Sequence, residues 1–273
     1  MAQSAHWDNV APNGSFVYTD LKTAVRESQS AYRLDLSNQI ITKDKKTLAK
    51  ASQLNNVMAL KLSNNQLQTI PTPFYQMSSL VYLYSSGNPL QNISDSVAML
   101  SQLRFIELAD TDFDTLPQSL CTLNRLQELA IAGNKDTLVV PPQINMLAPS
   151  LVQLKIFKTT VDTLPPQITH LDHLQQLWLY KCGLNTLPDS MDQMTELKIL
   201  WLDSNNLTTI PKDVYYLRNL TYLSLRGNKI SHIGSRVCFL ENLSTLDLRG
   251  NPIDPYEFEI LRVLLPGCRI LHD

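Results

Sequence analysis

The residue types that most often carry chemistry are sparse in this chain and form no catalytic pattern. The two closest histidines, His170 and His173 in the stretch THLDHL, have a spacing that could bring two imidazoles to one metal ion, but a surface loop explains them better. The acidic pair Asp110 and Asp112 is typical of a turn. The sequence has no phosphate-binding loop, nucleophile elbow or zinc-protease motif. It therefore predicts a protein that is not an enzyme and that binds no cofactor or metal.

Aromatic side chains are the second group with a chemical use. In LQQLWLYKCGL, residues 174–184, Trp178 and Tyr180 flank Leu179 among regularly spaced leucines. Alternation of this kind predicts a short strand in which Leu177 and Leu179 point inward and Trp178 points to the opposite face. Large aromatic rings on an exposed strand face can anchor a binding partner. Whether these rings are exposed depends on the strands that position them.

The spacing of this stretch recurs along the chain. The template L-x-x-L-x-L-x-x-N-x-L repeats every 23 residues, with longer steps of 26 and 25 residues at two places where we expect bulges, one of them near Asp136. An irregular first copy opens at Ala31, and the others open at Val57, Leu80, Leu103, Leu126, Leu151, Leu174, Leu197, Leu220 and Leu243. About ten copies of one supersecondary unit predict a solenoid.

This template resembles that of leucine-rich-repeat proteins. The second half of several copies, as in IPKDVYYLRNL and LPDSMDQMTEL, resembles the 23-residue, Pro-containing type of bacterial secreted and surface proteins and of the Ras-group proteins. The resemblance implies an α/β solenoid, a curved horseshoe with a parallel β-sheet on its concave face. Short helical, 3-10 or irregular segments would form the convex face, with helical caps at both ends. A shared fold leaves the function open.

One polar position follows each strand and is expected to be buried. It holds Asn, Thr or Cys at Asn65, Asn88, Thr111, Asn134, Thr159, Cys182, Asn205, Asn228 and Asn251. An Asn side chain there can satisfy backbone groups of its own turn and of adjacent turns. Cys182 is then a small buried residue rather than a redox centre. Cys238 and Cys268 remain either free thiols or a bridge that closes the C-terminal end.

Both ends of the chain have the pattern of a helical cap. Asp20 precedes a short amphipathic stretch, and Asp254 with Pro255 opens a second one. Caps are needed because a single repeat cannot bury its own apolar face. We therefore predict an N-terminal cap with a short helix at 1–30, about ten repeats at 31–254, and a C-terminal cap helix and tail at 255–273, all in one elongated domain.

Composition and charge narrow the classes of partner. The chain has 273 residues, of which 44% are hydrophobic and 18% charged, and its formal net charge is −2. With a pI near 6.2, it lacks the basic surface that nucleic-acid binding requires. No apolar run approaches the ~20 residues of a membrane span. We expect a monomer that does not bind nucleic acid and does not span a membrane.

The compartment is less constrained. The opening MAQSAHWDNV has no basic segment followed by an apolar one, so it is not read as a signal peptide. AQSA could begin a mature exported protein. The family resemblance favours a secreted, periplasmic or cell-surface location, with the cytoplasm as the alternative.

The concave face is the candidate binding surface. Its predicted residues are Tyr82, Tyr84, Phe105, Lys155, Phe157, Trp178, Tyr180, Trp201, Asp203, Tyr222 and Arg226. Strand positions favour aromatic residues in any case, yet an exposed aromatic patch rimmed by charges is typical of a binding site. We expect a non-catalytic module that binds a protein or peptide whose identity the sequence does not reveal. The alternatives are a carbohydrate-binding surface protein and a structural solenoid without a dedicated ligand.

Overall fold

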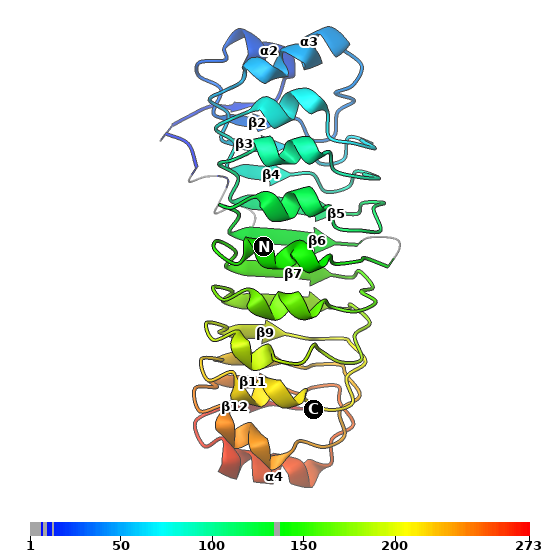
Figure 1. Ribbon diagram of the computed structural model, residues 1–273, viewed down its shortest axis with the longest axis vertical. Helices are drawn as coiled ribbons and strands as arrows, with labels where there is room; N and C mark the ends of the chain where they lie inside the picture. The colour runs from blue at the N-terminus through cyan, green and yellow to red at the C-terminus, as the bar shows by residue number, and fades with distance from the viewer. Residues whose placement is uncertain (1–6, 8–9, 13, 134–136) are drawn as a thin grey trace. The chain divides into compact units, whose positions relative to one another are not determined.

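A computed structural model describes residues 7, 10–12, 14–133 and 137–273 of the chain (Figure 1). The chain divides into two compact units, Met1–Lys135 and Asp136–Asp273, here called the N-terminal and the C-terminal unit. In each unit parallel strands form one layer and short helical turns form a second layer (Figure 1). The fold class expected from the repeat, a leucine-rich-repeat solenoid, is confirmed.

The N-terminal unit pairs its strands in chain order, from β1 to β6. Its strands are β1 (Val17–Tyr18), β2 (Arg33–Asp35), β3 (Ala59–Lys61), β4 (Tyr82–Tyr84), β5 (Phe105–Ala109) and β6 (Glu128–Ala132). Its helices are α2 (Leu21–Arg26) and α3 (Lys45–Ala49), and its 3-10 turns are η1 (Lys50–Gln53), η2 (Thr72–Gln76), η3 (Asp95–Met99) and η4 (Gln118–Thr122).

The C-terminal unit repeats the arrangement from β7 to β12, again in chain order. Its strands are β7 (Gln153–Phe157), β8 (Gln176–Tyr180), β9 (Ile199–Trp201), β10 (Tyr222–Ser224), β11 (Thr245–Asp247) and β12 (Arg269–Leu271). Its helical segments are η5 (Pro142–Leu147), η6 (Pro166–His170), η7 (Met191–Gln193), η8 (Lys212–Tyr216), η9 (Ser235–Phe239) and α4 (Pro255–Leu264).

The core follows the period of the template. Leu177, Leu179, Leu200 and Leu202 are fully buried, whereas Trp178 between the first two is only half-buried. Each buried leucine removes a side chain from water at a gain of about 1.5–3 kcal/mol. The alternation expected for these strands is therefore the alternation observed.

The polar position after each strand forms a buried ladder that joins neighbouring repeats. The Asn205 amide donates to the carbonyls of Leu179 (2.7 Å) and Leu202 (2.9 Å). Its Oδ1 accepts from the backbone N–H groups of Cys182 (3.0 Å) and Leu184 (3.1 Å). The Asn205 side chain thus satisfies carbonyl and N–H groups of two turns, which would otherwise be buried without partners. The Thr111 hydroxyl at the equivalent position is buried without a hydrogen-bond partner. Asn134 lies outside the described residues.

Cys182 substitutes for Asn in this ladder. Its side chain is fully buried, and its thiol donates to the carbonyl of Ile156 at 3.2 Å, the bond that the Asn205 amide makes to Leu179 one repeat later. Burial raises the pKa of the thiol to about 12, so it stays protonated at neutral pH. The expectation of a small buried residue is confirmed.

Both helical caps lie where the sequence predicts them. The Asp20 side chain accepts from the N–H of Thr23 at the start of α2, and the Asp254 side chain accepts from the N–H of Tyr256 at the start of α4. After α4 the chain adds a strand that was not expected, β12, which pairs with β11. The backbone of the terminal repeat is thus covered by one further strand.

The two longer steps of the repeat have different outcomes. The first accommodates its extra residues as α3, with the Asp44 side chain accepting from the N–H groups of Lys46 and Thr47. The bulge expected near Asp136 falls on residues 134–136, which lie outside the described part of the chain.

The ladder assignment predicts opposite effects for two substitutions of Cys182. Cys182→Asn should change the free energy of unfolding by less than about 1 kcal/mol, because Asn makes the bonds that this turn offers. Cys182→Asp should cost roughly 3–5 kcal/mol by leaving a buried charge without a cation. Urea denaturation measures both, and equal losses for the two variants would show that Cys182 is not a ladder residue.

Candidate functional site

The predicted surface residues fall into two groups, because the chain forms two units. Three belong to the N-terminal unit, and eight belong to the C-terminal unit. The first group is Tyr82, Tyr84 and Phe105; the second is Lys155, Phe157, Trp178, Tyr180, Trp201, Asp203, Tyr222 and Arg226. Each group lies on consecutive strands or just after them, and each is described within its own unit.

Four rings of the C-terminal unit form a continuous row, here called the aromatic column: Phe157, Trp178, Trp201 and Tyr222. Trp178 and Trp201 occupy paired positions of β8 and β9 and stack with centroids 4.6 Å apart and planes 20° from parallel. Phe157 meets Trp178 edge-on at 6.2 Å, and Tyr222 meets Trp201 at 5.6 Å. All four side chains are half-buried, so the column is partly open to solvent.

Hydrogen bonds hold the two indoles of the column in place. The Trp178 Nε1 donates to the Gln176 side chain at 3.2 Å, and the Trp201 side chain donates to the Asp203 carboxylate. Each indole also packs against a second aromatic neighbour besides its stacked partner. The rings therefore lose little freedom when a partner binds, which favours affinity.

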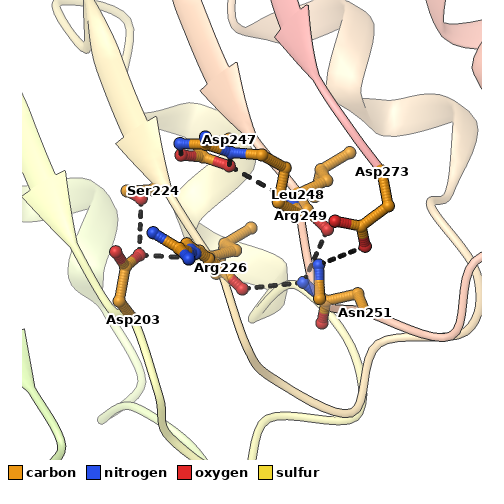
Figure 2. Close-up of polar contacts among 10 residues, drawn as sticks. Asp203, Ser224, Arg226, Asp247, Leu248, Arg249, Asn251 and Asp273 are labelled. Atoms are coloured by element: carbon orange, nitrogen blue, oxygen red, sulfur yellow. Dashed lines mark hydrogen bonds and ion pairs between the residues drawn. The ribbon is translucent and has the colours of Figure 1, made fainter.

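Asp203 is buried and accepts a hydrogen bond from Trp201 of the column. It is therefore not the exposed charge at the rim that the sequence suggested. Its side chain is 6% exposed. Figure 2 shows its Oδ1 accepting from the hydroxyl of Ser224 (2.5 Å) and from the backbone N–H of Arg226 (3.0 Å). Burial raises the pKa of Asp203 above its ordinary value, although these bonds oppose the shift. The expectation failed because Ser224 and the next turn cover the carboxylate.

A second buried carboxylate lies on β11. Asp247 accepts from Nε (3.0 Å) and from Nη2 (2.5 Å) of Arg249 in a bidentate pair, shown in Figure 2. Burial acts to raise the pKa of Asp247, but the Arg249 bonds outweigh it and the net shift is downward. Both buried carboxylates are thus engaged within the protein and are not free to bind a partner.

Cations border the column, on its strands or shortly after them. Lys155 places its Nζ 5.7 Å from the centroid of the Trp178 ring, and Lys181 places its Nζ 5.7 Å from that of Tyr180. Lys158 and Arg226 are exposed. The exposed charge around the column is therefore positive, since the nearby acids Asp203 and Asp247 are buried.

In the N-terminal unit the structure corrects two expectations. Tyr84 and Phe105 are 2% and 5% exposed, so they do not form an open surface, and Tyr82 is only half-buried. Their cover is Trp7, itself 7% exposed, whose ring meets Tyr84 edge-on at 6.1 Å. The Lys61 Nζ lies 4.0 Å from the Trp7 ring centroid and adds a cation–π contact.

The sequence interpretation missed Trp7, which packs with the candidate residues Tyr84 and Phe105. A single Trp within the polar stretch AHWDN has no repeat periodicity to indicate a partner. The available signal was its type, because an isolated large ring in a polar segment is seldom left in water. What it covers depends on contacts far apart in the sequence.

The histidines and cysteines of the described residues lie apart from the aromatic column. They contain no group of three or more His, Cys, Asp or Glu side chains that could hold a metal ion. His173 instead bonds Glu196 through Nδ1 at 3.0 Å on the surface, and Cys238 and Cys268 are free thiols. None of the helices in the described ranges has both the length and the hydrophobicity that crossing a membrane requires.

The buried Asp203 predicts a pH-dependent effect of one substitution. A raised folded-state pKa means that its contribution to stability is complete below the unfolded pKa and is lost as pH rises through the folded pKa. Asp203→Asn removes the charge and keeps one acceptor oxygen for the donors Ser224, Arg226 and Trp201. The lost acceptor costs the same at every pH, so the stability of the variant relative to the wild type should rise from acid to neutral pH, as the wild type loses the contribution of the protonated Asp203. Urea denaturation across this pH range measures it, and a difference that stays constant or falls with pH would contradict the assignment.

Comparison with solved structures finds the same architecture in several proteins. An internalin from Listeria monocytogenes matches with a TM-score of 0.68 and 15% identity, over 94% of this chain and 78% of that one. The Toll–Spatzle complex from Drosophila matches with a TM-score of 0.66 and 20% identity, over 93% and 42% of the two chains. The ectodomain of the receptor kinase GASSHO1 from Arabidopsis thaliana matches with a TM-score of 0.62 and 25% identity, over 82% and 27%.

Comparison of sequences gives the family. No curated protein sequence matches the chain significantly. The family model for the leucine rich repeat matches residues 29–90 and 195–253, one region in each unit. Both regions carry the template, the inward leucines and the ladder residues described above. Both units therefore contain leucine-rich repeats.

Proposed function

We propose that this protein is a non-catalytic binding module for a protein or peptide and that the aromatic column of the C-terminal unit is its contact surface. The observation that carries the proposal is the half-exposed, hydrogen-bonded stack of Trp178 and Trp201. Binding energy at protein interfaces concentrates in a few Trp, Tyr and Arg side chains. Here Tyr222 packs against Trp201, and the exposed Arg226 follows β10, the strand that carries Tyr222.

The stacking geometry favours a protein partner over a carbohydrate. A sugar ring binds an aromatic residue through a free ring face. Trp178 and Trp201 turn one face toward each other, and each also contacts a further ring, Phe157 or Tyr222. Ring edges and neighbouring side chains are then the surface left for a partner. Irregular apolar and polar groups of a polypeptide fit such a surface better than a flat sugar does.

Two of the similar structures are complexes with a polypeptide ligand. GASSHO1 is bound to CASPARIAN STRIP INTEGRITY FACTOR 2, and Toll is bound to Spatzle. This chain spans 27% and 42% of those two receptor chains, so they support the class of partner and nothing finer. The Pro-containing subtype, the exported location and the division into caps at 1–30 and 255–273 remain parts of the proposal.

Substitutions in the column and beneath it should have opposite effects. Trp178→Ala and Trp201→Ala should cost about 1 kcal/mol of stability, the stacking contribution of a half-exposed ring pair. They should weaken binding of a peptide by tenfold or more. Leu179→Ala and Leu202→Ala should cost roughly 2–5 kcal/mol through buried cavities and leave the affinity of the remaining folded protein unchanged.

The test is selection of a random dodecapeptide display library on the wild-type protein, with affinities and urea denaturation then measured for all four variants. A glycan array run in parallel tests the alternative. Peptides whose binding is lost with Trp201→Ala support the proposal. Enriched glycans without enriched peptides would favour the carbohydrate-binding alternative, and no enrichment on either would favour a solenoid without a ligand.

A further inference from the structure

The residue immediately before each described ladder residue has a left-handed backbone. In the C-terminal unit these residues and their φ values are Lys158 (50°), Lys181 (54°), Ser204 (56°), Gly227 (66°) and Gly250 (70°). In the N-terminal unit the equivalent residues are Asn64 (59°), Gly87 (70°) and Asp110 (53°). The turn therefore imposes a positive φ whatever side chain the position carries.

Residue type at this position is governed by strain. Gly adopts positive φ without penalty, and Asn and Asp tolerate it because their short polar side chains bond locally. The Asn64 amide also donates to Asn38 of the preceding repeat at 3.1 Å. Lys has neither advantage. Lys158 and Lys181 therefore place strained residues on two consecutive repeats where glycine would be more stable.

The left-handed turn serves the backbone, because the N–H groups of Lys158 and Lys181 donate to the carbonyls of Tyr180 (2.8 Å) and Asp203 (3.0 Å) on the next rung. The two side chains add little to this: among the described residues neither lysine forms an ion pair, and the Lys181 ammonium lies 5.7 Å from the centroid of the Tyr180 ring. Their backbones lie on adjacent rungs, because Phe157 and Tyr180 are paired in the sheet and strands lie about 4.8 Å apart. Two like charges at this spacing repel each other. The fold explains the backbone conformation but not the choice of two adjacent lysines, whose side chains form no ion pair in the described part of the chain; a strained residue type with unpaired charge is a candidate for contact with a partner.

The surrounding charge indicates what would bind there. Lys158 and Lys181 directly follow β7 and β8, the strands that carry Phe157 and Trp178 of the aromatic column. Arg226 is a further exposed cation two strands away. The acids of this region, Asp203 and Asp247, are buried and hydrogen-bonded. An anionic group beside the column would relieve the repulsion between the two ammonium groups.

We propose that Lys158 and Lys181 together bind an acidic side chain of the peptide partner, next to an apolar residue that contacts the aromatic column. The peptide is thus expected to carry Asp or Glu within a few residues of an aromatic or aliphatic anchor. This inference rests on the proposed function and adds the charge of the ligand to it.

The chain offers a matched control for the strain. Lys158→Gly and Lys181→Gly remove both the strain and the charge, whereas Ser204→Gly removes the strain at the equivalent position of the next repeat. All three variants should melt at a higher temperature than the wild type. Only the two Lys variants should lose affinity for a peptide selected from the dodecapeptide library, by roughly tenfold each.

The peptide supplies the other half of the test. The library selected on the wild type should be enriched in Asp and Glu beside an apolar residue, and changing the enriched acid to its amide should weaken binding to the wild type. The same change should have little effect on Lys158→Gly/Lys181→Gly, because the acid has then lost its partner.

Each remaining outcome is decisive. Selected peptides without an acidic excess, or Lys variants that bind as the wild type does while Trp201→Ala does not, would overturn the inference and leave the proposed function standing. If no peptide is enriched, or if Trp201→Ala binds normally, both fail. Binding of heparin that is lost in the Lys variants, with no acidic peptide enriched, would assign the lysines to an anionic polysaccharide instead.

Discussion

The structure depends on one buried interaction, the side-chain ladder through which Asn and Cys residues join neighbouring repeats. Every turn must enclose polar backbone groups, and burying them without partners costs free energy. Asn205 satisfies four such groups of two neighbouring repeats, and the Cys182 thiol makes one equivalent bond. Because the bonds link equivalent positions, they fix the register of the strands as well as the spacing of the turns.

That register explains why the functional side chains meet. Pairing of β8 with β9 sets Trp178 opposite Trp201, and the same pairing carries the polar groups that hold the rings. Asp203 extends this support, since it binds Ser224 of the next strand and the backbone of the turn after it. The left-handed turn that precedes the ladder places Lys158 and Lys181 beside the rings. The proposed surface is therefore a direct product of the stacking that stabilises the fold.

Periodicity in the sequence was sufficient for the strands, the inward leucines, the ladder and the two cap helices. It was also sufficient for the orientation of Trp178 and Trp201, because alternation along a strand is a local property. It failed for Tyr84 and Phe105, whose cover comes from Trp7, a residue outside the repeat. It failed for Asp203 because burial of that carboxylate depends on Ser224, a cross-strand partner that a single repeat does not reveal. Strand β12 was missed because its short sequence lacks the template.

The central claim is that the aromatic column of the C-terminal unit contacts a polypeptide partner. It is tested most directly by nuclear magnetic resonance of the three indole N–H groups in nitrogen-labelled protein, titrated with a peptide selected from the dodecapeptide library. The account predicts that the signals of Trp178 and Trp201 shift together with one midpoint, while that of Trp7, which is packed against Tyr84, does not move. A shift confined to Trp7, or binding of the peptide without a shift of either stacked indole, would contradict it.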